Sequence, residues 1–203
     1  MLQIRTITPD TLELLRKLNS IPELANTRLV GGTALALCLG HRLSIDLDFF
    51  GQVEGDTEMI ATYLLRYGFD VKIRSNQKNI HIFTINGVKT DIVNYPYLWI
   101  DDIIEEDGIR LGGLKDIAAM KIAAITNRGS KKDFIDVYFL LNHFSIEKMM
   151  DFYLKKYPSG SLFLSYKSLL YFADAENQLM PEMLIPTSWD DVKEKIIAEV
   201  RKI

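Results

Sequence analysis

The sequence contains a single cysteine, Cys38, and no apolar run that approaches the roughly 20 residues needed to cross a membrane. One cysteine cannot form a disulfide within the chain, which fits a reducing compartment. Residues 1–5 also lack the basic-then-apolar layout of a secretory signal peptide. These absences predict a cytoplasmic protein that has no contact with a membrane.

A strong excess of positive charge is missing as well. The chain carries 24 Lys and Arg against 27 Asp and Glu, a formal net charge of −3. Proteins that clamp nucleic acid over a large surface are strongly basic, so this class is excluded, although a local basic patch is not. Hydrophobic residues make up 48% and charged residues 25% of the 203 residues, the balance of an ordinary globular protein.

Residue periodicity predicts a mixture of helices and strands in the first half of the chain. Helices are expected over 9–20, 33–39 and 57–67, and strands over 27–30, 45–50, 69–73, 80–85 and 88–93. Asn86-Gly87, between the last two strands, is the strongest hairpin signal in the chain. Because regular strand–helix–strand alternation is absent, the sheet is expected to be antiparallel or mixed.

After Gly112-Gly113 the pattern changes, and no further strand is indicated. Helices are expected over 114–127, 131–143, 146–157, 161–173 and 189–203. We therefore predict an α+β fold in which a mixed sheet with flanking helices, residues 1–112, is followed by a helical C-terminal lobe, residues 113–203.

Asp46 and Asp48 are the first candidates for chemistry. Side chains two residues apart on a strand point to the same face, so both carboxylates project together. Their apolar neighbours, Leu47, Phe49 and Phe50, place the pair near a core, where two bare charges are unfavourable. Mg²⁺ binds a few carboxylate oxygens together with phosphates, which suits this pair. The alternative is a solvent-facing strand edge with two unrelated acids.

Gly31-Gly32-Thr33 stands between an expected strand and an expected helix. Glycines let a phosphate approach the backbone closely, and the first amides of a helix point toward it. Thr33 can cap the helix or donate a hydrogen bond to a phosphate oxygen. A tight turn followed by an N-cap explains the same residues. Asp46 follows after only one short helix, however, so the turn and the carboxylates are expected to share one edge of the sheet.

Asp91 lies among β-branched residues in the second strand of the expected hairpin. On this pattern alone it can equally be an ordinary surface residue. If it faces Asp46 and Asp48, the three carboxylates are enough to hold two Mg²⁺ ions about 4 Å apart.

Lys121 falls near the centre of an apolar helical stripe formed by Leu114, Ile117, Ala118 and Ile125, at ~100° per residue. A lysine in that place must extend to solvent, find a partner or line a cleft. Two interpretations stay open: a contact with a nucleotide phosphate, and a lysine that simply extends outward at a groove between domains.

The segment that leads into the next expected helix combines basic and acidic residues. Ser130 and Asp133 have the spacing of a capping box, which would leave Lys131 and Lys132 in a solvated helix start. The alternative is a basic rim that receives phosphates of a nucleotide or a nucleic acid. Asp133 and Asp136 share a helix flank and can orient the lysine of the preceding helix.

Together these motifs resemble the AbiEii/AbiGii toxin family, a branch of the nucleotidyltransferases built on the same core as polymerase β. Residues 31–36 and 41–50 are similar to the first and most specific motif, and Lys89-Thr90-Asp91 is similar to the second, K-x-D. The third motif, a lysine helix before an R-D-x-x-D segment, is matched by Lys121, Arg128, Lys132, Asp133 and Asp136. Lys132 stands where Arg is usual, which puts a bidentate phosphate contact there in doubt.

The resemblance spans about residues 29–141 and implies a nucleotidyltransferase-type sheet with the nucleotide between it and the helical lobe. It implies Mg²⁺-dependent transfer of a nucleoside monophosphate from an NTP to an acceptor. Family members are toxins of toxin–antitoxin pairs and some modify tRNA 3′ ends, so the implied partners are an RNA acceptor, in particular tRNA, and an antitoxin protein.

The resemblance also assigns roles to individual residues. The triphosphate would be cradled by Gly31, Gly32 and Thr33. Asp46 and Asp48 would hold Mg²⁺, and Asp91 would bind a second ion or take the acceptor proton. Lys121 would neutralise charge as pyrophosphate leaves. Further nucleotide contacts are implied for Arg42, Ser44, Lys132, Asp133 and Asp136, the first two by steadying the loop or touching phosphate.

Two alternatives remain at this point. The first is a nucleotidyltransferase that modifies a small molecule, which the net charge of −3 favours over an RNA acceptor. The second is a nucleotide-binding module that has lost catalysis and acts through a protein partner. The three intact carboxylates speak against the second, because a repulsive cluster without a metal ion is unfavourable.

Overall fold

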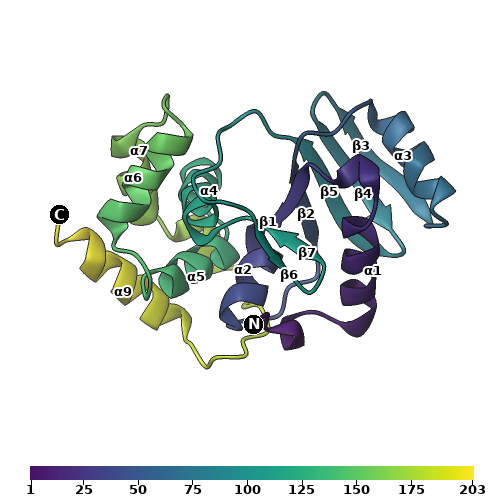
Figure 1. Cartoon of the computed structure of the whole chain (residues 1–203). Coiled ribbons are helices and arrows are strands. Elements are labelled where there is room, and N and C mark those ends of the chain that lie inside the picture. Colours follow the sequence, from purple (N-terminus) through teal and green to yellow (C-terminus); the bar gives the residue numbers. More distant parts are fainter. The chain divides into compact units, whose positions relative to one another are not determined.

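The computed structural model describes residues 1–203 with the exception of the Asn76 side chain. The chain, drawn in Figure 1, divides into two compact units. Unit 1 comprises Met1–Cys38, Ser44–Pro96 and Ile103–Gly112. Unit 2 comprises Leu39–Leu43, Tyr97–Asp102 and Gly113–Ile203. Two short segments from the first half of the chain therefore group with the helices of the second half.

Unit 1 is built on a seven-stranded sheet in the order β3-β4-β5-β2-β1-β7-β6. The strands are β1 (Thr27–Val30), β2 (Leu47–Gly51), β3 (Val71–Gln77), β4 (Ile80–Ile85), β5 (Val88–Asn94), β6 (Ile104–Glu106) and β7 (Ile109–Leu111). β2 pairs in parallel with β5, and β1 in parallel with β7, while the other neighbours are antiparallel. The predicted α+β class with a mixed sheet is confirmed.

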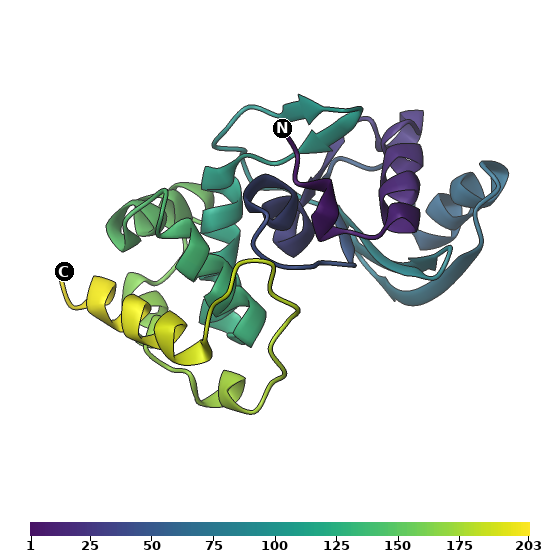
Figure 2. The ribbon, with the colours of Figure 1, turned by 90° about the horizontal axis from the view of Figure 1, so that it is seen from below.

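One face of the sheet forms the core of unit 1. Phe49 on β2, Phe83 on β4 and Ile92 on β5 alternate with more exposed residues and are fully buried. The helices of this unit are α1 (Pro9–Asn19), α2 (Gly31–Leu39) and α3 (Thr57–Arg66). Figures 1 and 2 show α1 and α3 on the same side of β3, β4 and β5. A 2.8 Å hydrogen bond between Thr57 Oγ1 on α3 and His81 Nδ1 on β4 fixes this face as the covered one.

Two of the hairpins in the sheet, β4–β5 and β6–β7, use the same turn chemistry. Asn86 and Gly87 have φ values of 48° and 83°, as a two-residue hairpin turn requires, and confirm the predicted hairpin. Asp107 and Gly108, with φ values of 54° and 73°, join β6 to β7 in the same way. This second hairpin was not predicted, because three-residue strands are too short to show alternation. The Asp-Gly pair was the available signal.

Unit 2 is helical, with α4 (Leu114–Asn127), α5 (Lys131–Leu140), α6 (Ile146–Lys156), α7 (Leu162–Leu169), α8 (Ala173–Glu176) and α9 (Trp189–Val200). The single helix expected over 161–173 is wrong: α7 ends at Leu169 and α8 begins at Ala173. The break lets Phe172 pack against Phe134, with ring centroids 4.9 Å apart, and against Trp189 at 5.9 Å.

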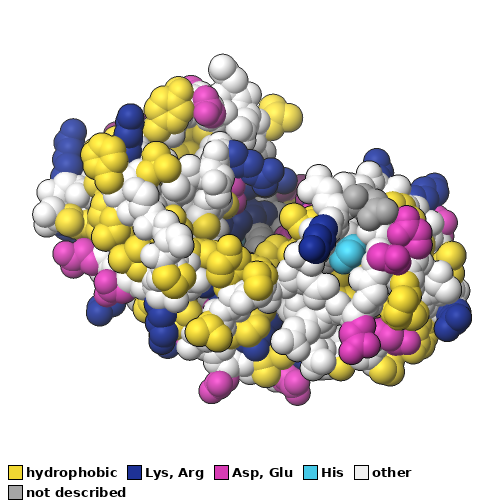
Figure 3. Space-filling view, turned by 90° about the horizontal axis from the view of Figure 1, so that it is seen from above, with side chains coloured by type: hydrophobic (Ala, Val, Ile, Leu, Met, Phe, Trp, Pro, Cys, Tyr) yellow, Lys and Arg dark blue, Asp and Glu magenta, His cyan; other side chains and the backbone are white. Residues whose placement is uncertain are grey.

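Apolar side chains remain at the surface of unit 2, as the yellow areas over its helices in Figure 3 show. On α7, Phe163 is 79% exposed, and Leu162 and Leu164 are exposed beside it. In the part of the chain that the structure describes, no helix is both long and apolar enough to span a membrane.

The lone cysteine lies on α2 with its side chain half-buried. Burial, reinforced by the negative charge of Glu106, raises the pKa of the Cys38 thiol to about 11. The group is therefore a protonated, unreactive thiol near neutral pH.

Gly51 tests the packing of β1 against β2. A β-carbon there would lie 2.1 Å from the backbone oxygen of Asn26 and 2.7 Å from Cα of Thr27. Gly51→Ala should force the strands apart and lower the free energy of unfolding by about 3 kcal/mol, the upper end for overpacking. Urea denaturation measures this. Gly68→Ala is the control, since φ is +84° there but no neighbour lies near; an equal loss in both variants would contradict the steric argument.

Candidate active site

The parallel pairing of β2 with β5 sets two of the three predicted carboxylates side by side in unit 1. Asp48 lies directly opposite Asp91 in the ladder, and neighbouring strands are about 4.8 Å apart. Asp46 precedes the first residue of β2 and is two residues from Asp48. All three carboxylates are partly accessible to solvent, whereas Leu47, Phe49 and Ile92 beside them are fully buried.

Lys89 is the cation that faces this group. Its ammonium donates a hydrogen bond to Asp91 Oδ2 at 3.0 Å and also lies 3.0 Å from Oδ1. Partial burial acts to lower the pKa of Lys89, but the bond to Asp91 and the charges of Asp91, Asp48 and Asp46 outweigh it and raise that pKa. Lys89 therefore interacts electrostatically with all three carboxylates. No role was predicted for Lys89, which was named only as part of the K-x-D motif. Its position two residues before Asp91, on the same face of the strand, was the available signal.

Gly31 provides the space that Asp48 occupies. Its φ is +69°, and a β-carbon there would lie 2.3 Å from Asp48 Oδ2. Val30, the residue before it, is the ladder partner of Asp48. Close approach to a carboxylate is thus the visible reason for a glycine at this position. A phosphate contact of Gly31 and Gly32 stays a prediction.

Thr33 and Ser44 hold the segment that carries Asp46. The buried Thr33 hydroxyl donates to the backbone carbonyl of Asp46 and lies 2.8 Å from Ser44 Oγ. Both hydroxyls are thus engaged next to the first carboxylate. In this arrangement they position Asp46, and the phosphate contacts predicted for them remain predictions.

The donor chemistry of this group fits Mg²⁺. Among the side chains that the structure describes, no group of three or more acidic, histidine or cysteine residues is arranged so that it could hold a metal ion. Asp91 Oδ1 is nevertheless buried without accepting a hydrogen bond, and three carboxylates supply the oxygen donors that Mg²⁺ prefers. Lys89 balances the charge of Asp91.

Unit 2 contains a second cluster of predicted residues, centred on the fully buried Asp136. Its Oδ1 accepts hydrogen bonds from His41 Nε2 at 2.9 Å and Arg42 Nε at 2.8 Å. Its Oδ2 accepts one from Arg42 Nη2 at 2.9 Å and lies 2.7 Å from Lys121 Nζ. Arg42 therefore steadies the loop that follows α2.

Lys121 has found partners within its own unit rather than extending to solvent. Its ammonium donates to Asp133 Oδ1 at 2.9 Å and is buried with it. The Ser130 hydroxyl donates to Asp133 Oδ2 at 2.6 Å. The capping box expected for Ser130 and Asp133 is wrong, because the Asp133 carboxylate turns toward Lys121 and no side chain caps α5.

The two lysines at the start of α5 differ. Lys132 is exposed, as either interpretation of that segment requires. Lys131 was expected in a solvated helix start or a basic rim, and this is wrong: it is buried, donates to the backbone oxygen of Glu176 at 3.0 Å, and lies 4.9 Å from the centre of the Trp189 ring.

His41 is the member of the second cluster that sequence analysis missed. It is fully buried, its ring centroid lies 4.8 Å from that of Phe139, and its Nδ1 is buried without a hydrogen-bond partner. An isolated histidine in a loop carries no periodic signal. Only its position beside Arg42 pointed to it.

The charges of this cluster set its dependence on pH. Burial acts most strongly to raise the pKa of Asp136, but the charges of Lys121 and Arg42 and the bonds from His41 and Arg42 hold it well below its usual range. A carboxyl group whose pKa is lower in the folded than in the unfolded protein stabilises the fold at any pH above its unfolded pKa of about 3.9. That stabilisation is lost as the pH falls through the pKa of the folded protein. Lys121, whose pKa is raised by the two aspartates against the effect of burial, loses its contribution only in strong base. The cluster is therefore fully stabilising around neutral pH.

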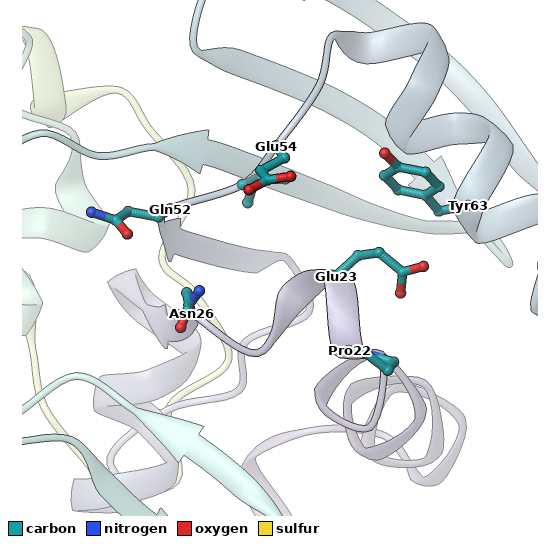
Figure 4. A pocket seen from close by; sticks show the side chains of 7 residues that line it. Pro22, Glu23, Asn26, Gln52, Glu54 and Tyr63 are labelled. Atoms are coloured by element: carbon teal, nitrogen blue, oxygen red, sulfur yellow. The ribbon is translucent and has the colours of Figure 1, made fainter.

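A pocket of about 470 Å³ lies elsewhere in unit 1, at the other end of β1 and β2 from the carboxylates. Asn26 precedes β1 and Gln52 follows β2, and Figure 4 shows them with Glu23, Glu54 and Tyr63 around the opening. None of the predicted site residues lines it.

Replacing Asp136 tests the second cluster. Asp136→Asn removes a buried negative charge and leaves Arg42 without its bidentate partner, so the free energy of unfolding should fall by about 3–5 kcal/mol. Denaturation followed by circular dichroism at neutral pH measures it. Asp151→Asn, in an exposed pair with Lys148, should change little. A stable Asp136→Asn variant would show that the cluster does not hold unit 2 together.

Comparisons with known proteins bear on this site. A family model described as "Nucleotidyl transferase AbiEii toxin, Type IV TA system" matches residues 13–100, which include all three carboxylates of unit 1 but not Lys121, Asp133 or Asp136. The protein aq_aa25 of Aquifex aeolicus is 32% identical over 205 residues, and the match covers 98% of each chain.

Two solved structures share the fold. JHP933 from Helicobacter pylori has a TM-score of 0.58 and 17% identity, with 97% of this chain and 92% of that chain covered. MenT4, a nucleotidyltransferase toxin from Mycobacterium tuberculosis, has a TM-score of 0.56 and 18% identity, with 94% and 81% covered. These two structures show a shared fold. The family match to the residues that carry the carboxylates, with the relative that is 32% identical over 98% of the chain, shows that the chain belongs to the AbiEii family of nucleotidyl transferase toxins.

Proposed function

We propose that the protein transfers a nucleoside monophosphate from an NTP to a hydroxyl group of an acceptor, with Mg²⁺ held by Asp46, Asp48 and Asp91. The observation that carries the proposal is the ladder register that sets Asp48 beside Asp91, with Asp46 two residues away. Mg²⁺ bound there would polarise the phosphoryl oxygens and neutralise charge on the triphosphate.

Asp91 is the residue best suited to receive the proton of the acceptor hydroxyl. Its Oδ1 accepts no hydrogen bond and has the Lys89 ammonium 3.0 Å away, so a hydroxyl that takes the place of Lys89 can donate to it. The acceptor oxygen then forms a bond to the α-phosphorus, the bond to the β-phosphate oxygen breaks, and pyrophosphate leaves. Asp46 and Asp48 would hold the metal ion during this step.

Lys121 can act on the nucleotide only if its present ion pairs change. We retain its role in neutralising pyrophosphate, together with nucleotide contacts of Lys132, Asp133 and Asp136. Because the Lys121 ammonium lies against both Asp133 and Asp136, it must leave at least one of them to reach a phosphate.

The acceptor that we propose is RNA, with tRNA as the first candidate, and the family implies an antitoxin as partner. A small-molecule acceptor is the competing possibility.

Asp46→Ala and Asp48→Ala test the metal assignment. Each should slow transfer by about 10³-fold, the effect of losing several kcal/mol of charge stabilisation. The protein is incubated with Mg²⁺, each α-³²P-labelled NTP in turn and total bacterial RNA, and label is followed in RNA, small molecules and the protein itself. Asp10→Ala, an exposed acid on α1, should label as the unmutated protein does. Unchanged transfer by Asp46→Ala would refute the assignment.

Gly31→Ala tests the space next to Asp48. The new methyl group would displace the Asp48 carboxylate, so transfer should fall nearly as far as in Asp48→Ala, with a loss of stability of about 1–2 kcal/mol from the positive φ. Gly108→Ala carries the same backbone strain, with φ at +73° and nothing within 4 Å, and should keep full activity. If both variants stay active, Gly31 is a turn residue only.

A further inference from the structure

The open face of β3, β4 and β5 is different in character from the covered one. Side chains that pair across the ladders share a face, and Lys89 pairs with Thr84, which in turn pairs with Lys72. Lys89 lies two residues from Asp91 on β5 and therefore on the same face. Lys72 and Lys89 are exposed, so this face of the outer strands stays accessible.

Three basic side chains form a row across this face, which we call the basic row: Lys89, Arg74 and Lys72. Arg74 stands at the irregularity in the β3–β4 register and its Nε donates to Thr84 Oγ1 at 2.6 Å, which holds the guanidinium at the middle of the row. Lys89 stands at the inner end, beside the carboxylates, and Lys72 at the edge strand. Lys72 is three strand spacings, about 14 Å, from β2.

Charge is segregated onto this part of the chain. Strands β3 to β5 and their turns contain four basic residues and one acidic residue, a net charge of +3, in a chain whose net charge is −3. The four are Lys72, Arg74, Lys78 and Lys89, and the single acid is Asp91. A local excess of cations that starts at a carboxylate site favours an extended polyanion as its ligand.

We infer that the basic row binds the phosphodiester backbone of an RNA acceptor, whose terminal hydroxyl then lies at Asp91. The inference rests on the proposed function and names the surface that its acceptor uses. A triphosphate bound at the carboxylates does not extend as far as Lys72, whereas a strand of nucleotides does. A small-molecule acceptor would have no use for the outer two cations. Because the row offers contacts to phosphates only, binding should depend on salt and little on sequence.

The test uses the double variant Lys72→Ala/Arg74→Ala of the full chain. Its affinity for a fluorescent single-stranded RNA, measured by anisotropy, should fall about tenfold, and the slope of log K against log salt should become shallower by about 0.7 per cation removed. In the labelling reaction its KM for RNA should rise, while NTP binding is unchanged. The matched control is Arg16→Ala/Arg66→Ala, which removes two exposed cations from α1 and α3 and should bind RNA normally.

The outcomes separate this inference from the proposed function. RNA affinity and salt slope equal to those of the unmutated protein would overturn the basic row, even if transfer is active. Asp46-dependent labelling of a small molecule with no RNA binding would overturn it too, and would leave the nucleotidyltransferase standing. Weakened RNA binding in the double variant supports the basic row, even in a protein that transfers nothing, and in that case only the proposed reaction fails. Melting curves confirm that the exposed alanine substitutions leave the fold intact.

Discussion

Mutual repulsion among Asp46, Asp48 and Asp91 is the constraint around which unit 1 is built. Two unit charges about 4 Å apart cost about 1 kcal/mol in water and about 4 kcal/mol near a protein surface. The sheet holds them by burying Leu47, Phe49 and Ile92 on its other face, and each such side chain contributes about 1.5–3 kcal/mol. The ladder register, fixed by that buried face, therefore outweighs the repulsion.

The two clusters of charge differ in how completely they are neutralised. In unit 2, Arg42 and Lys121 balance Asp133 and Asp136 in a buried network, so no charge is left over. In unit 1, Lys89 faces three carboxylates that remain partly open to solvent. Removal of one member of the buried, balanced cluster in unit 2 therefore lowers the stability of the fold first.

Lys89 belongs to two groups of residues. It is the counter-charge of Asp91 in the structure and the inner end of the basic row. A cation that binds the carboxylates reduces the attraction that holds Lys89 there, and its ammonium then becomes available to phosphate. Under the proposed function, metal binding and acceptor binding would thereby be linked through one side chain.

Much of this arrangement followed from local pattern. The period of two around Asp46 and Asp48, the Asn86-Gly87 turn and the Gly31–Thr33 turn predicted strand, hairpin and helix start, because each depends on residues close in sequence. The hairpin at Asp107-Gly108 and the break before Ala173 escaped prediction, since three-residue strands show no period and Phe172 leaves the helix for contacts with distant rings. Likewise, the capping box at Ser130 failed because Lys121 competes for Asp133.

By itself, the sequence determined which residue types were available and on which face of each element they lie, so it identified all three carboxylates and the lysine of α4. The tertiary structure decided which of them meet. Parallel pairing of β2 with β5 is a choice of register between segments about 40 residues apart, and no local pattern encodes it. The same holds for His41 and Arg42, which become partners of Asp136 only when the loop after α2 packs among the helices of unit 2. Burial then turns these charges into a structural cluster, whereas Asp46, Asp48 and Asp91 stay partly accessible to solvent.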